Sequence, residues 1–285
     1  MNPASYHFWE IAVKKSYFWI IFIFLIYLLE PLGALEKVYS ISGFGKDGKG
    51  EKEFSLEQLE SKEKNVMGSH YFDKGMGLKG TRLTVVPFVR LLEMFPPPDK
   101  SDSLWMDGAD DYEAVVSIEQ AKKYNLFWAT NIQVANPSEK PEWMNPLALV
   151  VPDSQRPPEI ERFLPANIKT LRYIRWDDYY RPISKIARAI PSVKIGFEAF
   201  TDDCLFCHSL KGVGGNKGGD LTKKFQLFSE QEQGLFAEAF IRKHYARSKN
   251  FAIEDFLRKK KVNKIVKFLS IVQKNKKINV LRGPL

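Results

Sequence analysis

Three residues in the last third of the chain have the types and the spacing for one defined piece of chemistry. Cys204 and Cys207 are separated by two residues, and His208 follows directly. Two cysteines at this spacing match the two vinyl groups of a haem, which they can bind through thioether bonds, while the adjacent imidazole ligates the iron. The motif predicts one covalently attached haem c, with Cys204 and Cys207 as attachment sites and His208 as the proximal iron ligand.

Other uses of a Cys-X-X-Cys pair fit the sequence less well. A zinc site requires four ligands, and the chain contains no second cysteine pair. A thioredoxin-like redox pair lies between a strand and a helix of a βαβ unit, which the sequence around Cys204 does not predict. A disulfide between the two cysteines would join positions only three apart and could not fasten distant parts of the chain.

The elements expected to position this motif are helical. A segment of helical character begins near Ser192, and a glycine-rich loop spans residues 212–219 after the motif. Two amphipathic helices are predicted next, over residues 229–245 and 253–272, the second with an apolar stripe at helical spacing and lysines on its other face. We therefore expect residues 192–285 to form a small all-α domain.

The surroundings of the motif resemble the class I cytochromes c. Gly196 and the aromatic residues after it precede Cys204 as in the N-terminal helix of that family, and residues 262–272 are similar to its C-terminal helix. The resemblance covers about a third of the chain. It implies that Gly196 lets the two helices approach closely, with Phe268 as an aromatic partner; the alternative is that both are ordinary core positions.

Two departures from that family concern the surroundings of the iron. Family members usually carry a proline whose carbonyl accepts the N–H of the iron-ligating histidine; this chain has Gly219, which can still offer a carbonyl. The loop that usually supplies a methionine as sixth ligand, residues 246–251, contains none. We expect His244 as the sixth metal ligand, because imidazole binds iron better than Lys249 or Asn250 does. The alternative is an open position, with His244 part of a basic surface.

The region in front of the helical segment, residues 36–191, is predicted to be an α+β or mostly-β domain. Its early part, residues 43–53, is rich in Gly, Lys and Glu and is predicted as a loop. Runs of branched and aromatic residues favour strands over four later segments. These segments are residues 114–118, 126–130, 147–151 and 170–176. The fold class expected for the whole chain is therefore multidomain, α+β followed by all-α.

Short motifs in this front region, such as residues 80–83, are similar to the molybdopterin-binding domain of sulfite-oxidase-like proteins. In that family a cysteine thiolate binds the molybdenum. No cysteine precedes Cys204, so no molybdenum cofactor is expected even if the fold is shared. The alternative is an unrelated α+β module that binds a partner subunit.

The N-terminus, residues 1–35, is predicted to export the chain. Two lysines precede a thirteen-residue apolar run over residues 17–29, a length that suits a signal peptide better than a membrane span. Leu32 makes the cleavage site imperfect, so an uncleaved membrane anchor remains an alternative. In both cases the body lies in the periplasm or on the outer face of the cytoplasmic membrane.

The net charge of +9 comes from the C-terminal end. From Arg242 onward there are fourteen Lys and Arg residues against only Glu254 and Asp255. Because an exported protein meets little nucleic acid, we expect this basic face to dock an acidic redox partner or a membrane surface, with a merely solvated helix face as the alternative.

The sequence thus predicts a single-electron carrier that docks a redox partner outside the cytoplasm. The alternative is a haem enzyme or gas sensor with an open sixth coordination position, or a haem-containing subunit of an oxidoreductase. The two classes differ in the sixth ligand, which decides whether a small molecule can reach the iron.

Overall fold

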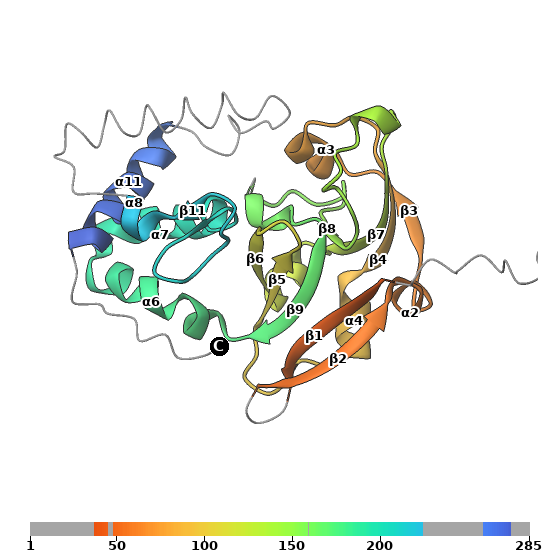
Figure 1. The fold of residues 1–285 in the computed structure, drawn as a ribbon, viewed down its shortest axis with the longest axis horizontal. Coiled ribbons are helices and arrows are strands. Elements are labelled where there is room, and N and C mark those ends of the chain that lie inside the picture. The colour runs from red at the N-terminus through yellow and green to blue at the C-terminus, as the bar shows by residue number, and fades with distance from the viewer. Residues whose placement is uncertain (1–36, 45–47, 159, 225–258, 275–285) are drawn as a thin grey trace, which may run out of the picture. The chain divides into compact units, whose positions relative to one another are not determined.

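The computed structural model describes residues 37–44, 48–158, 160–224 and 259–274. Over these residues the chain is a mixture of helices and sheets, as expected for an α+β fold (Figure 1). The predicted export segment 1–35, the predicted helix 229–245 and His244 lie outside the described residues. No helix in the described ranges is both long enough and apolar enough to cross a membrane.

The elements follow one another with short connections. The strands are β1 (Val38–Phe44), β2 (Gly50–Ser55), β3 (Asn65–Met67), β4 (Arg82–Pro87), β5 (Ser103–Gly108), β6 (Glu113–Ser117), β7 (Phe127–Gln133), β8 (Ala148–Val150), β9 (Ile168–Ile174), β10 (His208–Ser209) and β11 (Gly219–Asp220). The α-helices are α2 (Leu56–Glu60), α3 (His70–Met76), α4 (Phe88–Met94), α5 (Ile118–Lys123), α6 (Trp176–Ala189), α7 (Lys194–Ala199), α8 (Leu221–Lys224) and α11 (Lys259–Lys274). Single turns of other helix types are η2 (Pro137–Glu139), η3 (Glu161–Phe163), η4 (Pro191–Val193) and η5 (Phe200–Cys204).

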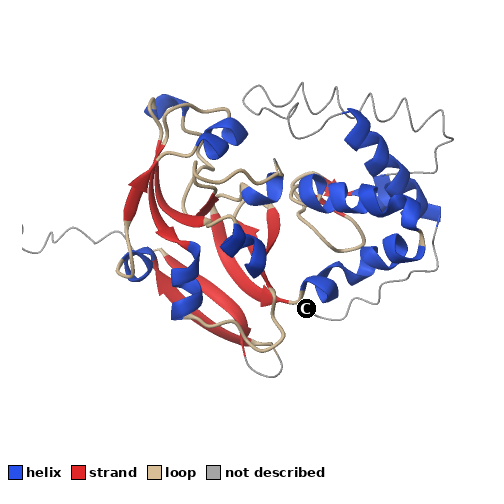
Figure 2. Ribbon diagram, turned by 180° about the vertical axis from the view of Figure 1, so that it is seen from behind, coloured by secondary structure: helices blue, strands red, loops and turns tan. Residues whose placement is uncertain are grey.

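Most of the strands belong to two sheets (Figure 2). The first has the order β2-β1-β9-β5-β6, with β1 parallel to β9 and β5 antiparallel to both of its neighbours. The second is antiparallel, with the order β3-β4-β7-β8. Sequence-distant strands are neighbours in the first sheet, since β1 near the start of the described chain pairs with β9.

Alternate residues of β4 and β5 enter different cores, because successive side chains of a strand point to opposite faces of the sheet. In β4, Val86 joins a core that contains residues of both sheets, while Val85 joins a second core with Phe72 of α3. In β5, Leu104 joins the shared core, whereas Trp105 packs against a third core formed mainly by the C-terminal helices. The C-terminal helices therefore pack directly on the first sheet.

The four predicted strand segments correspond to β6, β7, β8 and β9, with each end within three residues of the observed one. Two other expectations are wrong. Residues 43–53, predicted as a loop, contain the end of β1 and most of β2. The C-terminal series of helices begins at Trp176 rather than near Ser192, and α6 contributes Tyr180 and Ile183 to the same core as the later helices.

The segment 192–285 was expected to be all-helical, but it also contains the short parallel strand pair β10–β11. The all-α expectation is therefore only partly met. The predicted apolar stripe of its last helix is confirmed over the described part, α11. Its buried apolar side chains are Val262, Ile265, Val266, Phe268, Leu269 and Val272.

Helices α7 and α11 approach each other closely at Gly196. A Cβ atom built at Gly196 would lie 2.1 Å from the backbone oxygen of Lys264 and 3.0 Å from Cβ of Phe268. The Phe268 ring lies between two aromatic rings of the preceding segment, with centroids 5.7 Å from both Phe197 and Phe200. The prediction that Gly196 permits a close helix crossing with Phe268 as its aromatic partner is confirmed.

Replacing Gly196 with a β-branched residue is expected to force the two helices apart. Overpacking of a close contact costs about 1–3 kcal/mol, and the Gly196→Val variant should lower the free energy of unfolding by roughly this amount. Urea unfolding followed by circular dichroism measures the change. The matched control is Ile195→Val in the same helix, because Ile195 is 63% exposed and should tolerate the change. Equal stability of the two variants would contradict the close crossing.

Candidate functional site

Cys204, Cys207 and His208 are held at the junction of a helix and a strand. The π-helical turn η5 continues α7 and ends at Cys204, where the amide of Leu205 donates to the carbonyl of Phe200 at 3.0 Å. The amide of Cys207 then donates to the carbonyl of Cys204 at 3.1 Å, which closes a turn, and His208 begins β10. Single π turns recur at functional sites, since they add a residue to a helix without breaking it.

The ring of His208 is oriented by the backbone of β11. Nδ1 of His208 lies 3.1 Å from the carbonyl oxygen of Gly219, and the two residues are also partners in the β10–β11 pair. A carbonyl can only accept, so the proton of this hydrogen bond belongs to Nδ1, and Nε2 carries the lone pair that a metal ion requires. The expectation that the Gly219 carbonyl serves the iron-ligating histidine agrees with this geometry.

The backbone conformation at Gly219 explains why a proline is absent there. Gly219 has φ of +77°, whereas the proline ring fixes φ near −65°. A proline could not adopt this backbone conformation, so it could not direct its carbonyl at His208 from this turn. The same position would strain any residue with a Cβ atom.

Gly218 leaves the space that the imidazole ring occupies. A Cβ atom at this position would lie 2.3 Å from Cε1, 2.5 Å from Nδ1 and 2.6 Å from Nε2 of His208. The amide of Gly218 donates to the carbonyl of Cys207 at 2.6 Å, so the loop is tied back to the motif itself. Gly218 and Gly219 together form a cradle for the His208 ring.

The environment of both cysteines favours the protonated thiol. Burial raises the pKa of the Cys204 thiol, and the carboxylates of Asp203 and Glu161 raise it further. Burial is also the main cause that raises the pKa of Cys207. Reactive Cys-X-X-Cys pairs have a lowered thiol pKa, so this pair is poorly suited to thiolate redox chemistry.

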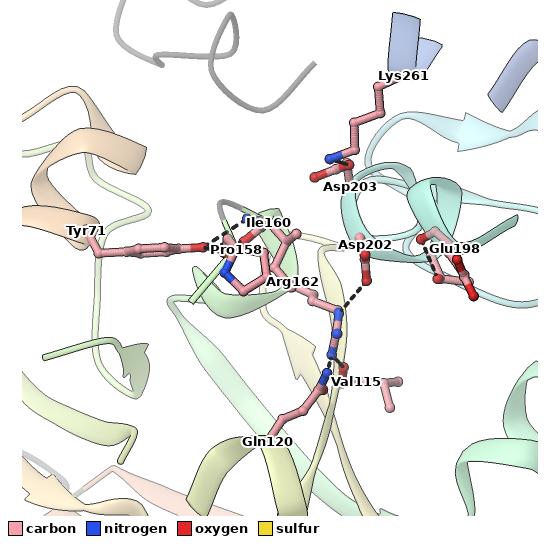
Figure 3. Close-up of polar contacts among 11 residues, drawn as sticks. Tyr71, Val115, Gln120, Pro158, Ile160, Arg162, Glu198, Asp202, Asp203 and Lys261 are labelled. Carbon is pink, nitrogen blue, oxygen red and sulfur yellow. Dashed lines mark hydrogen bonds and ion pairs between the residues drawn. The ribbon is translucent and has the colours of Figure 1, made fainter. Parts of the chain in front are cut away.

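An ion pair between a buried carboxylate and a partly exposed lysine connects the motif to the last helix. The carboxylate of Asp203, next to Cys204, has no exposed side-chain surface and pairs with Nζ of Lys261 in α11 (Figure 3). Burial raises the pKa of Asp203 to about 7 although Lys261 opposes the shift, and burial together with Asp203 raises the pKa of Glu161 to about 8. Removing the lysine of such a pair leaves the buried carboxylate uncompensated, so this contact is important for the position of Cys204.

Arg162 of η3 connects the strand-rich part of the chain to the motif segment. Its Nε donates to Oδ1 of Asp202 at 2.9 Å, and its Nη1 donates to Oε1 of Gln120 at 2.8 Å and to the carbonyl of Val115 at 3.3 Å (Figure 3). Arg162 is buried, and a buried guanidinium is tolerated only with such partners. Nothing local in the sequence marks this arginine as a contact of the motif.

The structure thus brings three of the four predicted site residues together, namely Cys204, Cys207 and His208. The fourth, His244, lies outside the described residues, as do the alternative ligands Lys249 and Asn250. Among the described residues no cluster of three or more His, Cys, Asp or Glu side chains could hold a bare metal ion. The arrangement fits a haem, which would be bound through Cys204 and Cys207 and ligated by His208.

Comparison with known proteins adds no relative to these observations. No protein-family model matches the sequence, and no curated protein matches it significantly. The functional argument therefore depends on the residues of the site itself.

Proposed function

We propose that this chain is an exported c-type cytochrome that transfers single electrons through one haem. The haem is covalently attached at Cys204 and Cys207, and His208 is its proximal iron ligand. The observation that carries the proposal is the hydrogen bond between Nδ1 of His208 and the Gly219 carbonyl, because it fixes the tautomer and the ring orientation that metal-ligating histidines need.

Attachment needs no oxidant. Cys204 and Cys207 would hold the haem through addition of each S–H across one vinyl C=C bond, in which an S–C bond forms and the thiol hydrogen goes to the other vinyl carbon. Both cysteines are free thiols in the structure, as this addition requires. When bound, the haem supplies the one-electron chemistry, and the chain holds it in place and sets its surroundings.

The close crossing of α7 and α11 at Gly196 supports the class I cytochrome c assignment independently of the motif. This crossing fixes the helix that leads into Cys204 against the last helix. The presence of β10–β11 and of the strand-rich domain in front does not oppose the proposal, since function is argued from the site rather than from the fold. No thiolate exists in the front domain to bind molybdenum, and no molybdenum cofactor is proposed.

We further propose a location in the periplasm or on the outer face of the cytoplasmic membrane, and an acidic redox partner. The apolar run at residues 17–29 supports export. The side of α11 opposite its buried stripe exposes Lys264 and Lys267. Such a basic face attracts an acidic protein or anionic lipid and raises the rate of encounter.

The Cys204→Ser, Cys207→Ser double variant tests covalent attachment. Wild-type protein made with a cytochrome c maturation system should keep haem through denaturing electrophoresis and give a peroxidase-active band. The double variant should lose that band, because a serine hydroxyl does not form the thioether. A haem-positive band from the double variant, or none from the wild type, would refute the assignment.

The His244→Ala variant tests the sixth ligand. If imidazole from His244 completes the iron coordination, the wild-type spectrum is low-spin, and the variant becomes high-spin and binds carbon monoxide. The matched control is His70→Ala, which removes an exposed histidine of the front domain and should leave the spectrum unchanged. A wild-type protein that is already high-spin and binds carbon monoxide would favour gas sensing or peroxidase-like chemistry instead of electron transfer.

A further inference from the structure

The turn between β5 and β6 lies directly against the segment that carries the haem motif. The amide of Glu113 donates to the carbonyl of Phe206, between the two cysteines, at 3.0 Å. The carbonyl of Asp111 accepts from two amides of the glycine-rich loop, those of Asn216 at 2.9 Å and Lys217 at 3.2 Å. Backbone hydrogen bonds of one turn thus reach residues that precede His208 and residues that follow it in the sequence.

The contact leaves no space for a side chain between the two segments. A Cβ atom at Gly215 would lie 2.3 Å from the carbonyl oxygen of Phe206, 3.0 Å from the carbonyl oxygen of Asp111 and 3.1 Å from the amide nitrogen of Glu113. All three are backbone atoms that cannot rotate away. The absence of a side chain at Gly215 is therefore a condition for this contact.

Tyr112 is the side chain that the turn places beside the motif. Its ring stacks on that of Phe206 with centroids 4.8 Å apart and an interplanar angle of 26°, and Nζ of Lys217 lies 5.8 Å from the centroid of the Tyr112 ring. Burial raises the pKa of Tyr112, so the hydroxyl keeps its proton and can donate. The Cys207 side chain is also among the causes that raise the pKa of Tyr112, which agrees with a Tyr112 hydroxyl close to the Cys207 sulfur.

We propose that Tyr112 is a positioning residue of the haem site, with its O–H directed at the sulfur of Cys207, and that the β5–β6 turn forms one wall of that site. This inference rests on the proposed function. The front domain would then influence the redox chemistry of the haem without binding a cofactor itself. An O–H dipole with its positive end toward the attachment edge stabilises the reduced haem, which carries one negative charge more than the oxidised form.

Tyr112→Phe isolates this effect, because it removes the hydroxyl and keeps the ring stacked on Phe206. In an optical redox titration of the holoprotein, the equilibrium constant for reduction should fall by about two- to fivefold, a fraction of the strength of one hydrogen bond. The matched control is Tyr173→Phe, which removes another hydroxyl of the front domain, one that donates to the carbonyl of Phe95 at 2.6 Å. This control should leave the constant unchanged. An unchanged constant in Tyr112→Phe, or an equal shift in both variants, would overturn the proposal.

A second variant, Phe206→Leu, removes the ring that holds Tyr112 in place. If the hydroxyl acts from this position, Phe206→Leu lowers the same constant, and adding Tyr112→Phe to it causes a smaller further fall than in the wild type. If the effects of the two substitutions on the free energy of reduction were strictly additive, the two side chains would not be coupled, which would contradict the proposal. The haem content of every sample is measured in parallel. Haem-free wild-type protein would refute the proposed function itself, whereas haem-loaded protein without the Tyr112 effect would refute only this inference.

Discussion

The position of one imidazole ring constrains the C-terminal half of this structure. The hydrogen bond from Nδ1 of His208 to the Gly219 carbonyl holds the ring and the tautomer in which Nε2 can face a metal. That bond requires a chain reversal with a positive φ at Gly219 and the absence of a side chain at Gly218. It also requires the pairing of β10 with β11, which returns the loop to the residue that begins β10.

The other contacts of the motif hold the segment before this ring. The crossing at Gly196 joins α7 to α11, and the ion pair between Asp203 and Lys261 makes a second connection between the same two parts of the chain. Arg162, which belongs to the strand-rich part of the chain, makes a further contact with the motif segment through its hydrogen bond to Asp202. Because these contacts come from different elements, the cysteines are fixed by tertiary structure rather than by the local turn alone. Such rigidity suits electron transfer, in which the site should change little between oxidation states.

Local patterns predicted those features that depend on local chemistry. The Cys204–His208 motif, the apolar stripe of α11 and the strands β6 to β9 follow from spacing and periodicity. Helix α6 was missed because Pro182 interrupts its pattern, although its apolar side chains pack with the later helices. Arg162 and Tyr112 could not be predicted, since their roles arise from contacts with residues far along the chain, at Asp202 and Phe206.

The central claim of this account is that a haem is bonded to Cys204 and Cys207. The most direct test is peptide mass spectrometry of the denatured wild-type protein after expression with a cytochrome c maturation system. The account predicts that the peptide containing both cysteines is heavier by the mass of one haem and no other peptide is. A peptide with two free thiols, or one lighter by two hydrogens because of a disulfide, would contradict it.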